Sequence, residues 1–267
     1  MTLFQAVVLG IIQGLAEFLP ISSSAHLALA PWLLHWPEPG LSFDVALHTG
    51  TLAAVLVYFR AEWGRLIAAA WSIVTTRRVE TESQRRVVYL IIATIPGGIA
   101  GVLLDKYAET TFRAPQLIAT AMIALGVVLW LVDRGAREAR PLSAMRPVDA
   151  LIIGVAQIFA LIPGVSRSGA TITAGLADRF DRESAAVFSF LMSMPIIFAA
   201  ALFKVPQVIH QQGFSGPLIA GVVASAVSGW LAISGLLRYV TRRSYGIFAL
   251  YRVVVGIAVL LLVHYRG

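Results

Sequence analysis

Six long apolar segments dominate this chain and limit what it can fold into. At a helical rise of about 1.5 Å per residue, each can cross a hydrocarbon core about 30 Å thick. Of the 267 residues, 58% are hydrophobic and only 13% are charged, which is far below the charged share of a soluble domain. We therefore predict an all-α polytopic membrane protein with one membrane domain over residues 1–267. The six full spans are predicted at 43–59, 87–104, 115–132, 184–205, 216–237 and 246–264.

Two further apolar stretches are interrupted by helix-breaking residues. Residues 3–36 break at Pro20 and the serines after it, and residues 148–178 break at Pro163-Gly164. The fragments are too short to span a bilayer, so we predict two re-entrant helical hairpins. The N-terminal stretch has no Lys or Arg before it and contains Glu17. We therefore expect it to be retained rather than cleaved as a secretory signal.

The two interrupted stretches resemble each other, which indicates a duplication. Residues 6–13 (AVVLGIIQ) align with residues 150–157 (ALIIGVAQ), and the serine segments 20–25 and 163–168 align after one residue of slippage. Each half would hold one hairpin and an odd number of full spans, so the second half would lie upside down in the membrane. This predicts an inverted-topology repeat. The predicted boundaries are 1–135 for repeat one and 147–267 for repeat two.

The basic residues predict the orientation. In this topology most of the 21 Lys and Arg residues fall on one face, which the positive-inside rule places in the cytoplasm. Both termini are then expected on the outer, periplasmic side. The net charge of +7 is mostly a topology signal, and nucleic-acid binding loses its support. The cytoplasmic set is Arg60, Arg65, Arg77, Arg78, Arg85, Arg86, Arg134, Arg137, Arg140, Arg146, Arg179, Arg182, Arg238, Arg242 and Arg243, and the opposite set is Lys106, Arg113, Lys204 and Arg266.

Polar residues gather at the first break. Gln13 and Glu17 are four residues apart and would share a helical face. An ionisable side chain in the bilayer costs about 2.5–3.5 kcal/mol, so Glu17 and His26 are candidate site residues. A structural histidine bonded to a carbonyl is the alternative for His26. An ordinary helix N-cap is the alternative for the hydroxyls of Ser22, Ser23 and Ser24.

The second break suits a phosphate group. Arg167 lies between the hydroxyls of Ser166 and Ser168, and Gly164 permits close approach of the backbone. A half-helix that begins here would add its positive end to the same anion site. The alternative is a purely structural ion pair between Arg167 and Glu17.

Further embedded polar residues are open to two interpretations. Asp44 and His48, four residues apart in the first span, could line the same cavity, although Asp44 could also lie at the interface. Arg252, beside Tyr251 in the last span, is a candidate for substrate contact, with snorkelling to an interface as the alternative.

The two motifs together resemble the signatures of a known family. They read Gln13-x-x-x-Glu17-x-x-Pro20-x-Ser22-Ser23-Ser24-x-His26 and Pro163-Gly164-x-Ser166-Arg167-Ser168-x-x-Thr171. They are similar to the motifs of the BacA/UppP family of undecaprenyl-diphosphate phosphatases, bacterial membrane enzymes linked to bacitracin resistance. The resemblance covers essentially the whole chain, including residues 43–51 and 188–195.

The resemblance implies a hydrolase acting on a phosphoric anhydride. Its substrate would be undecaprenyl diphosphate, and its products undecaprenyl phosphate, the lipid carrier for peptidoglycan synthesis, and phosphate. The implied location is the bacterial cytoplasmic (inner) membrane. The implied partners are the polyprenyl diphosphate lipid and the bilayer, and a homodimer is left open.

Carried over residue by residue, the family pattern implies specific roles. Ser23 and His26 would be the catalytic hydroxyl and imidazole, Glu17 would pair with Gln13, and Arg167 would clamp phosphate. The rest of the pocket would be Ser22, Ser24, Gly164, Ser166, Ser168 and Thr171. A divalent cation, Mg²⁺ or Ca²⁺, is implied without an organic cofactor. Glu17 is its candidate ligand, because the amide of Gln13 is a poorer ligand than a carboxylate.

Two questions stay open at this point. Ser23 is the leading nucleophile, with His26 as general base and Glu17 orienting it, but water activated at His26 or Glu17 would serve as well. Inverted repeats with broken helices are also the usual build of a transporter. A transporter or flippase of a phosphorylated polyprenyl lipid is therefore the alternative function, although a hydroxyl beside a base favours hydrolysis.

Overall fold

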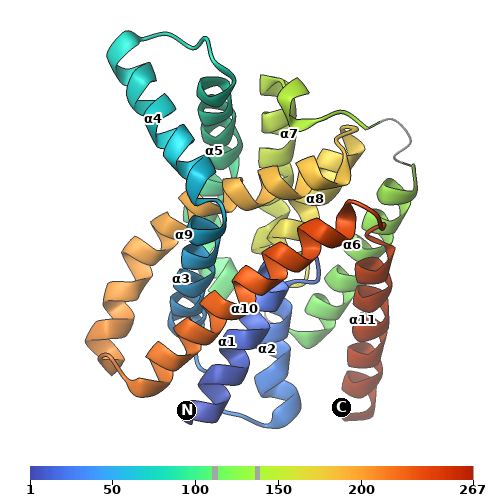
Figure 1. Ribbon diagram of the computed structural model, residues 1–267. Helices are drawn as coiled ribbons and strands as arrows, with labels where there is room; N and C mark the ends of the chain where they lie inside the picture. Colours follow the sequence, from blue (N-terminus) through green and yellow to red (C-terminus); the bar gives the residue numbers. More distant parts are fainter. Residues whose placement is uncertain (110–113, 136–138, 267) are drawn as a thin grey trace.

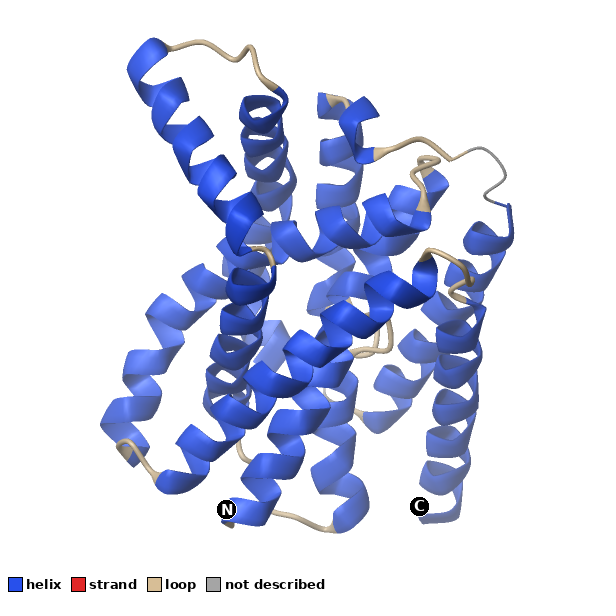
Figure 2. Ribbon diagram, in the orientation of Figure 1, coloured by secondary structure: helices blue, strands red, loops and turns tan. Residues whose placement is uncertain are grey.

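The computed structural model describes residues 1–109, 114–135 and 139–266 of the chain. These residues form eleven α-helices joined by turns and loops (Figures 1 and 2). Five helices are long and apolar enough to cross a membrane, which confirms the prediction of an all-α polytopic membrane protein. They are α5 (Glu82–Glu109), α6 (Pro115–Gly135), α9 (Arg182–Gln212), α10 (Gly216–Val240) and α11 (Gly246–Arg266). Arg113, Arg137 and the last residue of repeat two, Gly267, lie outside the described residues.

Both interrupted stretches fold as helical hairpins. The first consists of α1 (Leu3–Phe18) and α2 (Ser23–Leu34). The second consists of α7 (Pro147–Ile158), the 3₁₀ turn η3 (Phe159–Leu161) and α8 (Arg167–Ala177), and it follows the turn η2 (Leu142–Ala144). In Figure 1, α1 rises from the end of the molecule that holds both termini, and α7 descends from the opposite end. The boundaries of the duplication, at 135 and 147, stay a prediction.

The first predicted span differs from the expectation. Helix α3 (Leu41–Tyr58) ends at Phe59, whose φ of −97° and ψ of 25° interrupt it, and a further helix, α4 (Arg60–Thr76), follows at once. The apolar part, Phe43–Tyr58, is shorter than a full crossing, so within the part of the chain that the structure describes five of the six expected spans are long enough. The sequence reading missed α4 because Arg60, Glu62 and Arg65 interrupt its apolar pattern.

Glycines let the first arm of each hairpin lie against a span of the other predicted repeat. Helix α1 contacts α10 and helix α7 contacts α5. At Gly10 and Gly14 a Cβ would collide with α10, and at Gly154 it would collide with the backbone of Ala93 in α5. Small residues at such crossings allow the close packing that drives helix association in lipid. These contacts hold the first arm of each hairpin against its partner span.

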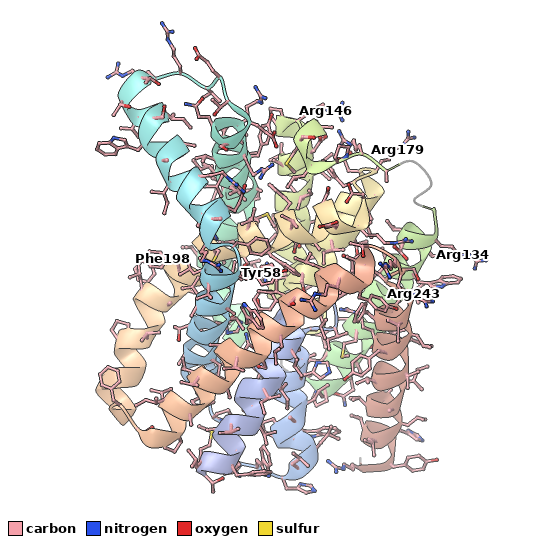
Figure 3. The ribbon with its side chains drawn as sticks, viewed as in Figure 1. Tyr58, Arg134, Arg146, Arg179, Phe198 and Arg243 are labelled. Carbon is pink, nitrogen blue, oxygen red and sulfur yellow. The ribbon has the colours of Figure 1, made fainter. Side chains whose placement is uncertain are left out.

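Arginines mark the helix ends away from the termini. Figure 3 shows Arg146 and Arg179 near the top of the view, with Arg134 and Arg243 at the far ends of α6 and α10. Several basic side chains here form ion pairs, including Arg140 with Asp178 at 2.8 Å. Both termini lie at the opposite end of the molecule (Figure 1). Which end faces the cytoplasm stays a prediction.

Candidate active site at the meeting of two hairpin tips

Each hairpin tip turns at a serine that caps the following helix. Ser22 has a φ of 79° and its hydroxyl accepts a hydrogen bond from the backbone N–H of Ala25 at 3.3 Å. Ser166 has a φ of 75° and accepts one from the N–H of Gly169 at 3.1 Å. A positive φ is uncommon outside glycine, and the capping bonds help to hold it. The N-termini of α2 and α8, which are the positive ends of the helix dipoles, therefore both lie at the tips.

The two tips contact each other directly. The backbone N–H of Gly164 donates to the Ser22 hydroxyl at 3.2 Å, and the Ser168 hydroxyl donates to the Leu19 carbonyl at 3.3 Å. Two hydroxyl pairs complete the arrangement, Ser22 with Ser24 and Ser166 with Ser168, each at 3.2 Å. Five of the predicted pocket residues, Ser22, Ser24, Gly164, Ser166 and Ser168, therefore lie in one cluster.

Arg252 of α11 ties both tips together. Its fully buried guanidinium donates to the carbonyl of Pro20 at 3.0 Å, to that of Gly164 at 2.7 Å and to that of Val165 at 3.0 Å. A fourth bond reaches the Met122 carbonyl in α6 at 3.1 Å. Arg252 does not snorkel to an interface, and in this structure its guanidinium binds backbone carbonyls of the tips rather than lying free for a substrate.

Glu17 is the centre of the polar cluster, and its carboxylate is almost fully buried. One oxygen, Oε1, accepts a hydrogen bond from Nη2 of Arg167 at 2.9 Å. The other oxygen, Oε2, accepts from the Ser23 hydroxyl at 2.6 Å and from the Gln13 amide at 3.1 Å. The ion pair considered for Arg167 is therefore present, and the predicted nucleophile is bonded to the same carboxylate.

His48 also lies at this carboxylate. Its Nε2 is 3.3 Å from Oε2 of Glu17, and its Nδ1 is 2.7 Å from the Asp44 carbonyl. The structure thus brings His48 to the site, one of the two arrangements that the sequence left open. The spacing of four residues between Asp44 and His48 in an apolar helix was the available signal.

The hydrogen bonds of His26 go to residues other than Ser23. Its Nδ1 is 2.7 Å from the Ser22 carbonyl, which can only accept, so Nδ1 carries the hydrogen. Its Nε2 forms a hydrogen bond of 2.7 Å with the Tyr251 hydroxyl, which donates when the ring is neutral. The expected pairing of His26 as general base with Ser23 is therefore not formed in this structure, where the base bonded to Ser23 is Glu17. Tyr251 is a neighbour of His26 that the sequence analysis did not assign to the site.

Thr171 supports Arg167. Its hydroxyl donates to the Arg167 carbonyl at 2.8 Å and pairs with the Ser189 hydroxyl at 2.7 Å. Both side chains are fully buried. The Ser189 carbonyl accepts from Nη1 of Arg167 at 3.0 Å. Ser189, which sequence reasoning placed only inside a family segment, thus helps to orient the predicted phosphate clamp.

The surroundings of Glu17 do not fit a metal ligand. Both of its oxygens accept from hydrogen-bond donors, and one of these donors is a guanidinium. Among the residues that the structure describes, no three His, Cys, Asp or Glu side chains come together as a metal site. The implied Mg²⁺ or Ca²⁺ is therefore not matched by a protein cage at Glu17.

Comparison with known proteins gives matches along nearly the whole chain. The model of a family described as bacitracin resistance protein BacA matches residues 6–258. The undecaprenyl-diphosphatase of Gemmatimonas aurantiaca is 61% identical over 259 residues, which cover 97% of each chain. The undecaprenyl-diphosphatase of Pelotomaculum thermopropionicum is 50% identical over 262 residues, covering 98% of this chain and 97% of the relative. That of Moorella thermoacetica is 51% identical over 257 residues and 96% of each chain. The region matched by the family model contains both hairpin tips.

Proposed function

The chain belongs to the bacitracin resistance protein BacA family, and on that premise we propose that it is an undecaprenyl-diphosphate phosphatase. It hydrolyses the terminal phosphoric anhydride bond of undecaprenyl diphosphate and so returns undecaprenyl phosphate to peptidoglycan synthesis. The observation that carries this proposal is the shared carboxylate of Glu17, which accepts from the Ser23 hydroxyl at 2.6 Å and from Arg167 at 2.9 Å. A nucleophile, a base and a phosphate-binding cation thus meet at one point.

Charge stabilisation comes from Arg167 and the two helix ends. A guanidinium has five N–H donors, and the bonds to Glu17 and Ser189 come from its two Nη atoms. The positive ends of α2 and α8 begin at the same tips. Such groups stabilise the charge on a transferring phosphoryl group, which is the main task in phosphoryl transfer. The prenyl tail stays in the bilayer, where the multi-pass fold holds the site.

The proposed chemistry has two steps. The Ser23 oxygen attacks the terminal phosphorus, its proton passes to Glu17, and the bond to the bridging oxygen breaks, so undecaprenyl phosphate leaves. A water molecule then attacks the phosphorus of the phosphoserine, the bond from phosphorus to the Ser23 oxygen breaks, and the proton on Glu17 passes to that oxygen, while the hydrogens of the water leave with the phosphate. Direct attack by a water activated at Glu17 would give the same products, and the Ser23→Ala variant distinguishes the two routes.

Phosphate release by the purified protein in detergent tests the function. Wild-type protein should release phosphate from undecaprenyl diphosphate, and a folded Arg167→Ala variant should lose that release. Arg242→Ala, which removes an exposed arginine, is the matched control and should behave as wild type. Absence of release from folded wild-type protein would contradict the proposal. Movement of the intact lipid between leaflets would then point to the transporter or flippase.

The proposed location is the bacterial cytoplasmic membrane, with both termini outside. The side from which the site is reached can be tested directly, because the chain has no cysteine. In cells that carry a Ser24→Cys variant, a membrane-impermeant thiol reagent should label the protein from the outer side. Labelling from the cytoplasmic side only would contradict this orientation.

Any divalent cation is proposed to arrive with the diphosphate. Phosphate oxygens are ligands that Mg²⁺ commonly uses in enzymes, together with one or two carboxylates, whereas the Glu17 oxygens here are taken by donors. Calorimetric titration of lipid-free protein with Ca²⁺ or Mg²⁺ should show no binding that a Glu17→Gln variant abolishes. A site lost in that variant would contradict the proposal.

A further inference from the structure

His48, on α3, contacts the carboxylate of Glu17. It approaches the same oxygen of Glu17 that accepts from Ser23, at 3.3 Å. Its side chain is 26% exposed, whereas that of Glu17 is 4% exposed. The His48 side chain is therefore more exposed than the carboxylate that it contacts.

The hydrogens of the His48 ring follow from its two partners. The Asp44 carbonyl, 2.7 Å from Nδ1, can only accept, so Nδ1 carries a hydrogen. The other nitrogen, Nε2, contacts Oε2 of the Glu17 carboxylate at 3.3 Å, and this contact is an ion pair when the ring carries a hydrogen on both nitrogens.

Glu17 needs a donor of this kind during the reaction. Arg167 holds Oε1 in this structure, but an arriving diphosphate competes for the same guanidinium. A phosphate that attracts this guanidinium weakens its bond to Oε1, so the position of the carboxylate against Ser23 then depends on the partners of Oε2. The remaining partners of Oε2 are Ser23 itself and Gln13, which donate hydrogen bonds, and His48, which contacts it at 3.3 Å.

We propose that His48 is a positioning residue that holds Glu17 against the Ser23 hydroxyl when Arg167 engages the substrate. This inference rests on the proposed phosphatase function and assigns His48 a task in that reaction. The task requires an N–H at the distance of Nε2 from the helix. It does not require an aromatic ring.

Glutamine and asparagine variants provide the test. The amide nitrogen of glutamine reaches about as far from Cβ as Nε2 of histidine does, and asparagine is one bond shorter. His48→Gln should therefore retain kcat to within about fivefold of wild type. His48→Asn and His48→Leu should lose about 10- to 100-fold in kcat, as expected for loss of a hydrogen bond to a charged group. KM should change by less than about threefold in all three variants, because His48 acts through Glu17 rather than on the lipid.

Two comparisons separate the possible failures. His264→Asn, at an exposed position near the C-terminus, is the matched control and should keep wild-type kcat. Thermal unfolding of each variant in detergent shows whether a loss of activity reflects loss of folding.

Equal activity of folded His48→Asn and wild type would overturn the inference and leave the phosphatase function intact. Equal loss in His48→Gln and His48→Asn would also overturn it, because packing of the ring would then be the requirement. Absence of phosphate release from wild type would instead contradict the function on which the inference rests.

Discussion

Gly164 donates its backbone N–H to the Ser22 hydroxyl, and this bond of 3.2 Å joins two hairpin tips that lie 142 residues apart in sequence. The same hydroxyl caps α2 through Ala25. The helix end that presents Ser23 is therefore fixed by a bond from the other hairpin. The geometry of the candidate site depends on both tips at once, which explains why neither motif alone forms it.

Gly164→Ala should damage this junction. Gly164 has a φ of 99°, and a Cβ at this position would lie 2.4 Å from the Ile118 carbonyl oxygen. Backbone strain and overpacking each cost about 1–3 kcal/mol, so we expect a clearly lower unfolding temperature and reduced phosphate release. Gly213→Ala is a matched control, because Gly213 also has a positive φ of 63° but has open space around it. Equal effects of the two substitutions would show that crowding at the tip is unimportant.

Ser23→Ala tests the covalent route. Removal of a nucleophile ordinarily costs several orders of magnitude in kcat, so we expect at least a thousandfold loss with little change in unfolding temperature. The measurement is the initial rate of phosphate release, with the exposed Ser143→Ala variant as control. A variant that keeps more than about a tenth of wild-type turnover would rule out Ser23 as nucleophile and favour direct attack by water.

Glu17→Gln should impair both activity and stability. The substitution keeps the size of the side chain but removes the charge that pairs with Arg167, whose side chain is only 12% exposed. Loss of one partner of a buried ion pair costs about 3–5 kcal/mol in soluble proteins, and a neutral amide is a poor base for Ser23. We expect at least a hundredfold lower turnover and a lower unfolding temperature. Glu80→Gln, at an exposed ion pair with Arg78, should change neither quantity measurably.

The sequence predicted those parts of the fold that depend on local composition. Runs of apolar residues located five spans, and Pro20 and Pro163 located the two hairpin turns. The end of the first predicted span at residue 59 agrees with the end of α3 at Tyr58, and what the sequence did not show is that α4 follows at once. The charged residues in the first turn of α4 make that segment resemble a loop in the sequence.

The sequence indicated which residues form the site better than it indicated which of them bond to each other. Glu17, Ser23 and Arg167 stand out as polar groups in apolar surroundings, and they do meet. The family resemblance implied that His26, three residues later on the same helix, would act as the base for Ser23. The positive φ at Ser22 instead starts α2 so that Ser23 bonds to Glu17, and His26 bonds to Tyr251 on α11. Contacts made across 225 residues of sequence leave no periodic pattern, so the partners of His26 and Arg252 could not be predicted.

Arg252→Lys should loosen both hairpin tips together. A lysine ammonium is a single point with three donors, whereas the guanidinium bonds four carbonyls on both tips and α6 at distances of 2.7–3.1 Å. Each carbonyl left without a partner in a buried site costs about 1–3 kcal/mol. We therefore expect faster amide hydrogen exchange at residues 19–24 and 162–168, together with lost phosphate release, while exchange in α5 stays slow. Arg266→Lys, which alters an exposed contact with the Trp32 carbonyl, is the control. Unchanged exchange at both tips would show that Arg252 is not what holds them, and faster exchange at one tip only would show that it does not couple them.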